Sequence, residues 1–206
     1  MAEGAIERSA SDALIEATVR RLWVADEGEV RILDICQETG LSTSVIYGHF
    51  RSRQGLIDAA LLTILTEVTE GIVKDIEEIL NGPHPTGRLL DSLHAYLVDP
   101  TRREADVKNR QAYVRVCATA LARASLRPGF LEVYSRYIGR CAELYDEAVA
   151  QGLLPDTLTG RQWALLLESQ MVAKALHDLD ADWDDHGDWL VALARLAQGA
   201  TMPARP

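Results

Sequence analysis

Residues 31–56 read RILDICQETGLSTSVIYGHFRSRQGL, and this stretch carries the most specific pattern in the chain. Two short segments with helical apolar spacing, 31–39 and 42–49, flank the dipeptide Gly40-Leu41. This pattern predicts two short helices that meet at a sharp angle around a glycine turn. One face of the second helix carries small or polar side chains that can approach a groove and form hydrogen bonds: Ser42, Thr43, Ser44, Tyr47 and His49.

The run from Gly40 to Arg53, GLSTSVIYGHFRSR, resembles the helix-turn-helix signature of the TetR family of transcriptional regulators. The family pattern has a small-residue turn, a short recognition helix, an aromatic pair and a basic residue that opens the fourth helix. The preceding segment 34–39 resembles the family's second helix. The resemblance covers about 50 residues, and the rest of the chain matches only in length and all-helical pattern.

By position, the resemblance implies a DNA-binding surface around the recognition helix. The exposed start of that helix would reach base edges in the major groove through Thr43, Ser44 and Val45. Contacts to backbone phosphates are implied for Tyr47, His49 and Arg53. Arg31, just before the second helix, is not part of the family pattern, but its side chain can reach a phosphate. Ser42 is expected at the N-cap of the recognition helix and completes the DNA-binding set.

Four positions depart from the family pattern. Thr43 stands where family members often carry Lys or Arg, and Gly48 replaces a residue that is frequently bulkier. Gly55 lies in the first turn of the next helix, and Arg31 occupies the usual Ser or Thr cap of the second helix. These differences affect the expected target sequence and affinity more than DNA binding itself.

The remainder of the chain repeats the helical spacing of three to four residues, and strand alternation is absent. Helices are predicted over 6–24, 31–39, 42–49, 52–80, 86–98, 103–125, 128–151, 160–178 and 187–199. The expected fold class is therefore all-α, with about nine helices. We expect residues 1–50 to form a helix-turn-helix DNA-binding domain, and residues 51–206 to form a helical effector-binding and dimerisation domain.

The charge balance at first argues against a nucleic-acid partner, because phosphate contacts need Lys and Arg. The chain has a formal net charge of −10, and residues 1–60 hold six Arg, no Lys and ten acidic residues. Residues 40–57, however, carry Arg51 and Arg53 without any acidic residue. This distribution predicts a small cationic patch, few phosphate contacts in each subunit and weak non-specific binding.

Several other classes of protein are disfavoured by the sequence. The 206 residues include no apolar run long enough for a membrane span, and the acidic N-terminus does not resemble a signal peptide, so a cytoplasmic location is expected. Three dispersed cysteines and five dispersed histidines give no metal or disulfide pattern. No catalytic constellation or phosphate-binding glycine loop is found, so no enzymatic activity and no cofactor are expected.

A cluster of tyrosines and cysteines in the middle of the chain is open to two interpretations. It can be a packed helical core, or it can line an apolar ligand pocket with a few hydroxyls. The candidate pocket residues are Tyr96, Tyr113, Cys117, Tyr134, Tyr137, Cys141, Leu167 and Met171.

Two charged segments also have alternative interpretations. Residues 102–140 hold nine Lys or Arg against three acidic residues. They are expected to form a solvated face that complements acidic neighbours, and a pocket for an anionic effector is the alternative. The six Asp of residues 178–188 are expected in a solvated loop, since the pattern lacks the Gly and terminal Glu of a calcium loop.

The segment 160–178 is apolar nearly all round and needs burial on more than one side. Together with 187–199 it can form a four-helix interface between two copies of the chain. The candidate interface residues are Trp163, Leu166, Val172, Leu176, Trp189, Leu193 and Leu196.

The resemblance thus implies a homodimeric repressor that binds a double-stranded DNA operator and is released from it by a small-molecule effector. Two alternatives remain open at this point. The chain can be a helical enzyme or ligand-binding protein whose helix-turn-helix serves packing, or a regulator controlled by a protein partner.

Overall fold

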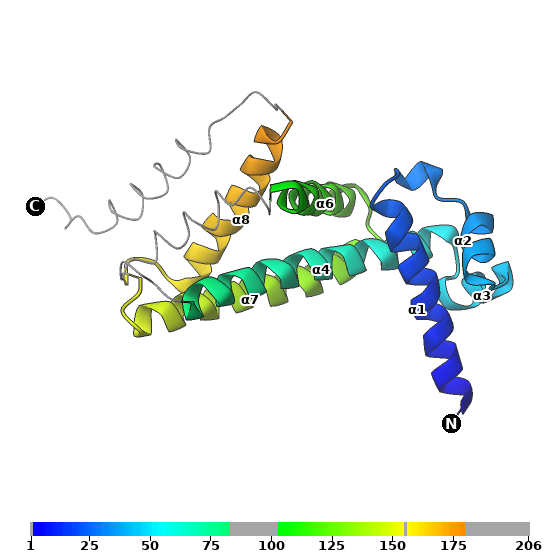
Figure 1. Ribbon diagram of the computed structural model, residues 1–206, viewed down its shortest axis with the longest axis horizontal. Helices are drawn as coiled ribbons and strands as arrows, with labels where there is room; N and C mark the ends of the chain where they lie inside the picture. Colours follow the sequence, from blue (N-terminus) through cyan, green and yellow to red (C-terminus); the bar gives the residue numbers. More distant parts are fainter. Residues whose placement is uncertain (1, 83–102, 155, 180–206) are drawn as a thin grey trace, which may run out of the picture. The chain divides into compact units, whose positions relative to one another are not determined.

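The computed structural model describes residues 2–82, 103–154 and 156–179, and its described regular elements are all helices (Figure 1). The α-helices are α1 (Ala2–Leu22), α2 (Ile32–Thr39), α3 (Thr43–Phe50), α4 (Arg53–Asn81), α6 (Arg103–Ala122), α7 (Arg127–Ala150) and α8 (Gly160–His177). A short 3-10 helix, η1 (Glu27–Glu29), follows α1. The expected all-α fold class is confirmed, and the seven expected helices that fall in the described ranges are all present.

The expected helices 86–98 and 187–199 lie outside the described residues. Elsewhere the bounds differ from expectation by only a few residues, with the start of α1 four residues earlier the largest difference. The sequence pattern did not predict η1, which closes a capping box between Asp26 and Glu29. Three residues are too few to show a helical period, so only the Asp-to-Glu spacing could have indicated it.

The chain forms two compact units. The first consists of residues 1–67 and 115–133, and the second of residues 68–114 and 134–206. The expected division at residues 50 and 51 concerns function, and it stays a prediction. The long helices α4, α6 and α7 each contribute residues to both units.

In the first unit, α1 packs against α2 and α3 through the stripe that its spacing predicts. Leu14, Thr18 and Leu22, each four residues apart, are all fully buried. The Thr18 hydroxyl donates to the carbonyl oxygen of Leu14 at 2.8 Å, so its burial leaves no unpaired donor. The stripe holds the two short helices in place on α1.

In the second unit, α4 and α7 run alongside each other (Figure 1), and α8 packs against them. The buried centre of this packing is formed by Tyr137, Ile138, Cys141 and Ala164. The helix α8 begins at a full capping box, in which the Thr159 hydroxyl accepts from Gln162 N and the Gln162 amide oxygen accepts from Thr159 N.

Candidate functional site

The two short helices meet at a turn whose geometry follows from its residues. Gly40 closes α2 with φ of 70°, a left-handed conformation that glycine adopts without strain from a Cβ atom. Ile35 of α2 and Ile46 of α3 are both fully buried. These two anchors fix α2 and α3 on the unit and leave the opposite face of α3 in solvent.

That opposite face carries most of the predicted DNA-binding residues. Thr43, Ser44 and His49 are exposed, and the Tyr47 side chain is 52% exposed although it is aromatic. Val45 is half-buried and therefore less available than its neighbours. The helix thus presents the hydroxyl and imidazole groups that the sequence places there, and their contacts with DNA stay predictions.

Ser42 stands at the expected N-cap of α3, but its hydroxyl makes no capping hydrogen bond. Instead the hydroxyl oxygens of Ser42 and Ser44 lie 2.7 Å apart and share a hydrogen bond. Both side chains are exposed, so these hydroxyls can exchange that bond for one with a ligand.

Arg53, expected to contact a phosphate, hydrogen-bonds to the protein itself. Its Nε donates to the Val30 carbonyl oxygen at 2.9 Å, and its Nη2 donates to the Glu27 carbonyl oxygen. These bonds tie the first residue of α4 to the segment between η1 and α2. The phosphate contact stays a prediction, and it would have to use Nη1 or the second N–H of Nη2, or displace one of these bonds.

The arginines of α1 are also engaged within the unit. Arg20 donates to Glu38 at 2.8 Å, and Arg21 donates to Glu38 at 3.0 Å and lies 3.7 Å from Asp34. The hydrogen bond from Arg20, together with the one from Arg21, lowers the pKa of Glu38, and partial burial opposes this shift. These pairs fasten α1 to α2 and neutralise two arginines of α1.

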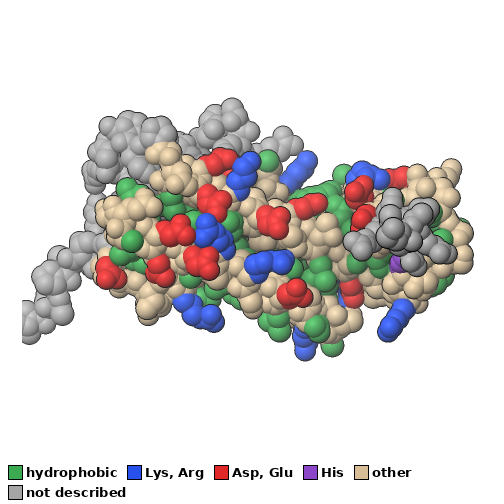
Figure 2. Space-filling view, turned by 90° about the horizontal axis from the view of Figure 1, so that it is seen from below, with side chains coloured by type: hydrophobic (Ala, Val, Ile, Leu, Met, Phe, Trp, Pro, Cys, Tyr) green, Lys and Arg blue, Asp and Glu red, His purple; other side chains and the backbone are tan. Residues whose placement is uncertain are grey.

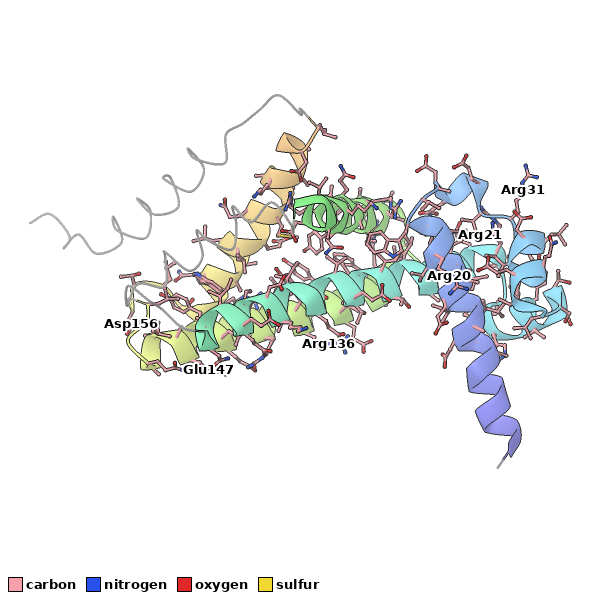
Figure 3. All side chains as sticks on the ribbon, in the orientation of Figure 1. Arg20, Arg21, Arg31, Arg136, Glu147 and Asp156 are labelled. Carbon is pink, nitrogen blue, oxygen red and sulfur yellow. The ribbon has the colours of Figure 1, made fainter. Side chains whose placement is uncertain are left out.

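Arg31 and Arg51 remain as exposed cations beside the helix-turn-helix, and no described residue forms an ion pair with either. Figure 3 shows Arg31 pointing away from the ribbon at the start of α2. Arg51 ends α3 with φ of 63°, a conformation that costs a non-glycine residue about 1 kcal/mol. The patch expected from the sequence consisted of Arg51 and Arg53. In the structure the exposed arginines beside α2 and α3 are Arg31 and Arg51, whereas Arg53 is half-buried.

Gly55, a departure from the family pattern, is explained by the structure. A Cβ atom on this residue would lie 2.1 Å from the carbonyl oxygen of Phe50. The first turn of α4 therefore approaches the end of α3 too closely for any side chain. The close approach sets how α3 leads into α4, and it depends on a contact that the sequence does not reveal.

A polar network that the sequence did not indicate connects the turn between α6 and α7 to the rest of the first unit. The Asp58 carboxylate accepts from Arg123 at 2.7 Å, from Ser125 at 2.9 Å and from Gln54 at 3.1 Å. Arg123 also donates to Glu27 at 2.6 Å. Asp58 lies 65 residues from Arg123 in the chain, so no local spacing could have indicated the pair.

The predicted ligand-pocket residues fall into four groups. Four of them lie in the second unit at or beside its buried centre, namely Tyr134, Tyr137, Cys141 and Leu167. Tyr113 and Met171 belong to the same unit, whereas Cys117 belongs to the first unit. Tyr96 lies outside the described residues. A role in ligand binding stays a prediction for every one of them.

Two tyrosines of this group share one acceptor that the sequence did not single out. The Glu168 carboxylate of α8 accepts from the Tyr113 hydroxyl at 3.4 Å and from the Tyr134 hydroxyl at 3.2 Å. The only sequence feature that could have indicated this acceptor is the single acidic residue within the mostly apolar run ALLLESQMVA. We refer to Tyr113, Tyr134, Tyr137 and Glu168 as the Glu168 cluster.

Two members of the buried centre are held in their neutral forms. Burial raises the pKa of the Cys141 thiol to about 11. Burial also raises the pKa of Tyr137, and the nearby Cys141, Glu168 and Tyr134 add to this shift. The Tyr137 hydroxyl oxygen is buried, and it has no hydrogen-bond partner of normal geometry among the described groups.

The basic segment 102–140 complements acidic neighbours, as expected, but it is not simply a solvated face. Arg110 forms a nearly buried pair with Asp178, with Nε to Oδ2 at 2.7 Å and Nη2 to Oδ1 at 2.9 Å. Arg140 donates to Glu77, Glu143 and Glu147. On the face drawn in Figure 2, acidic and basic side chains are interspersed. These pairings leave little support for an anionic effector.

The same pair corrects the expectation for residues 178–188. The side chain of Asp178 is 6% exposed, so this residue is not part of a solvated loop. The prediction failed there because the partner, Arg110, lies 68 residues away. The other five Asp lie outside the described residues.

The predicted dimer-interface residues differ in exposure. Leu166 and Leu176 of α8 are 50% and 58% exposed, and Val172 is half-buried. Trp163 packs within its own chain, where its ring stacks on Tyr145 at 5.5 Å between centroids. Trp189, Leu193 and Leu196 lie outside the described residues. The interface stays a prediction, with Leu166 and Leu176 the available apolar contacts.

The described ranges contain no group of three or more His, Cys, Asp or Glu side chains placed to hold a metal ion. None of the helices in those ranges is long and apolar enough to cross a membrane.

The chain matches no protein-family model and no curated protein. It does match solved structures over nearly its whole length. GusR from Salmonella enterica has a TM-score of 0.65 at 20% identity, covering 93% of this chain and 95% of its own. A TetR-family transcriptional regulator from Agrobacterium tumefaciens has a TM-score of 0.59 at 15% identity, covering 94% and 98%. The fatty acid degradation regulator FadR from Bacillus halodurans has a TM-score of 0.53 at 17% identity, covering 95% and 96%.

Proposed function

We propose that this chain, which has the fold of solved TetR-family transcriptional regulators, is a homodimeric sequence-specific DNA-binding repressor of the cytoplasm. One observation carries the proposal. The helix α3 follows a glycine turn and is anchored in the unit by the buried Ile46. Its opposite face presents four polar side chains to solvent: Thr43, Ser44, Tyr47 and His49. Short polar side chains on a protruding helix are suited to hydrogen bonds with base edges in the major groove.

The charge distribution supports limited phosphate binding. In each subunit Arg31 and Arg51 are exposed cations beside the recognition helix, whereas Arg20 and Arg21 are paired with acids. A dimer that uses both exposed arginines in each subunit would show a log–log salt slope of about −4 from these contacts. Such a protein would bind its operator by sequence readout more than by general attraction to DNA.

One helix-turn-helix domain, which we call the head of a subunit, contacts few base pairs. Dimerisation adds specificity, because two half-sites in the DNA double the contacts and fix their spacing. The exposed Leu166 and Leu176 of α8 support an interface on this helix. We expect Leu166→Glu combined with Leu176→Glu to give a monomer by light scattering and to weaken DNA binding.

Release of DNA by a small molecule is the proposed control. An effector that binds the second unit with different affinity in two conformations would shift α4, which also supplies residues to the first unit. The shift would change the separation of the two heads in the dimer and so lower DNA affinity.

The test is a selection from a random duplex DNA library with the full-length protein. We expect enrichment of an inverted repeat whose half-sites are about one helical turn or a multiple of it apart. Failure to enrich any sequence above a protein-free selection would overturn the proposal.

The selected site then allows a matched test of the phosphate contacts. Arg31→Ala should weaken binding and reduce the salt slope by about 1 for each phosphate that the arginine neutralises. Arg136 of α7 is also an exposed arginine (Figure 3), so Arg136→Ala removes the same charge and should leave both quantities unchanged. Equal effects of the two substitutions would contradict the assignment of Arg31.

A further inference from the structure

The Glu168 cluster holds a carboxylate whose charge is weakly compensated. Charge-assisted O–H···O⁻ hydrogen bonds are ordinarily about 2.5–2.7 Å long. The bonds from Tyr113 and Tyr134 to Glu168 measure 3.4 and 3.2 Å, so each stabilises the carboxylate much less than a short bond would.

Glu168 also differs from Asp178 and Glu77, two other acids of its unit, in having no cationic partner among the described residues. Asp178 is paired with Arg110 at 2.7 Å, and Glu77 is paired with Arg140 at 2.8 Å. In the part of the chain that the structure describes, no Lys or Arg lies within 4.0 Å of the Glu168 carboxylate. A partly buried negative charge without a counter-charge is stabilised by any cation that reaches it.

A second observation points to a ligand at the same place. The Tyr137 side chain is 3% exposed, and its hydroxyl has no hydrogen-bond partner among the described groups. The Tyr137 ring meets the Tyr113 ring edge-on at 6.4 Å between centroids, which places it in the same cluster. A buried hydroxyl without a partner is costly, and a bound molecule that offers a polar atom would satisfy it.

The surroundings of the cluster are apolar and aromatic. Tyr134, Trp163 and Leu167 are only partly buried against the centre of the unit, as are three residues of α4: Ile72, Val73 and Ile76. Aromatic faces attract cations, and apolar side chains bind an uncharged hydrocarbon body. A carboxylate ligand, by contrast, would meet Glu168 with like charge.

We propose that the Glu168 cluster binds an organic cation with an apolar body, with Glu168 as the counter-ion and Tyr113, Tyr134 and Tyr137 as flanking phenols. This names the chemical class of the effector and rests on the proposed function only for the consequence, which is release of DNA. The binding itself is tested without DNA.

The experiment is calorimetric titration of the full-length protein with ions of matched shape. Tetraphenylphosphonium and the smaller phenyltrimethylammonium are the cations, and tetraphenylborate is the anion of the same shape as the former. We expect at least one of the two cations to bind. If tetraphenylphosphonium binds, we expect tetraphenylborate to bind at least tenfold more weakly. Absence of binding by both cations, or tighter binding of the anion, would overturn the proposal.

Variants separate the cluster from general charge effects. Glu168→Gln should weaken cation binding at least tenfold, while Glu70→Gln, which removes the same charge from an exposed position on α4, should leave it unchanged. Tyr137→Phe should weaken binding of the cation yet raise the midpoint of thermal unfolding, because it removes an unpaired buried hydroxyl. Unchanged cation affinity in Glu168→Gln would exclude this cluster as the site.

The outcome with DNA is read separately. If the cation binds through Glu168 but leaves the complex with the selected operator intact, the site stands and its role as the effector site is wrong. If no DNA sequence is enriched, the proposed repressor function fails, and the titration still decides whether the cation site exists.

Discussion

The guanidinium of Arg53 donates from Nε to the backbone carbonyl oxygen of Val30 at 2.9 Å and from Nη2 to that of Glu27. A residue at the start of α4 thereby holds the segment that leads into α2. By sequence position Arg53 is predicted to contact a phosphate, and within its own unit its bonds tie the start of α4 to the segment before α2. The distinction leads to a measurable difference between stability and affinity.

Arg53→Ala should lower the free energy of unfolding by about 1.5–3 kcal/mol, because it removes hydrogen bonds from a charged donor. The Val30 carbonyl oxygen loses this donor, and the Glu27 carbonyl oxygen keeps only its bond from Val30 N. Urea denaturation measures this change. Arg51→Ala, at an exposed position two residues earlier, should alter stability by less than about 0.5 kcal/mol. Equal stability of the two variants, with DNA affinity abolished only in Arg53→Ala, would return Arg53 to the phosphate-binding role.

Asp58→Asn should destabilise the first unit by about 2–4 kcal/mol, since a mostly buried carboxylate that accepts from Arg123, Ser125 and Gln54 is neutralised. The change is measured by urea denaturation followed by circular dichroism. Asp12→Asn makes the same substitution at an exposed position on α1 and serves as the control. Similar small effects of both substitutions would show that the network contributes little.

Glu38→Gln should cost about 0.5–1 kcal/mol at pH 7, the range of an exposed ion pair, because Arg20 and Arg21 lose their charged acceptor. The hydrogen bond from Arg20 lowers the pKa of Glu38 in the folded state, so the unfolded chain takes up the proton first as the pH falls. The stabilisation is therefore complete above the unfolded pKa, about 4.3, and is lost as the pH falls through the lower folded pKa. A deficit relative to the unsubstituted protein that persists unchanged at pH 3 would contradict this assignment.

Gly48→Ala should stabilise the free protein by about 0.5–1 kcal/mol, because a Cβ atom there meets no atom within 4 Å and alanine is the better helix former. The same methyl group lies on the exposed side of α3, so we expect weaker binding to the selected operator. Thermal unfolding and fluorescence anisotropy measure the two effects.

Gly139→Ala is the matched control for this prediction. Gly139 is an exposed glycine within α7 whose added Cβ would also meet nothing within 4 Å. It should give the same stabilisation without a change in DNA affinity. A Gly48→Ala variant that binds DNA as well as Gly139→Ala would place position 48 away from the DNA.

Local sequence was sufficient to define the helices and the helix-turn-helix. The predicted segments 31–39 and 42–49 correspond to α2 and α3, and the predicted 52–80 corresponds to α4, Arg53–Asn81. These features follow from interactions between residues three or four apart and from the left-handed turn at Gly40. Both are visible in short stretches of the sequence. The buried stripe Leu14, Thr18 and Leu22 is of the same kind.

Which polar groups meet was settled by the packing of distant helices. Arg53 donates to the Val30 carbonyl oxygen, and Arg123 donates to Asp58. Tyr113 and Tyr134 donate to Glu168, which lies 55 and 34 residues away in the sequence. Helical periodicity shows which face of a helix is apolar, but it does not show which partner covers that face. The candidate DNA-reading helix could therefore be found in the sequence, whereas the Glu168 cluster required the fold.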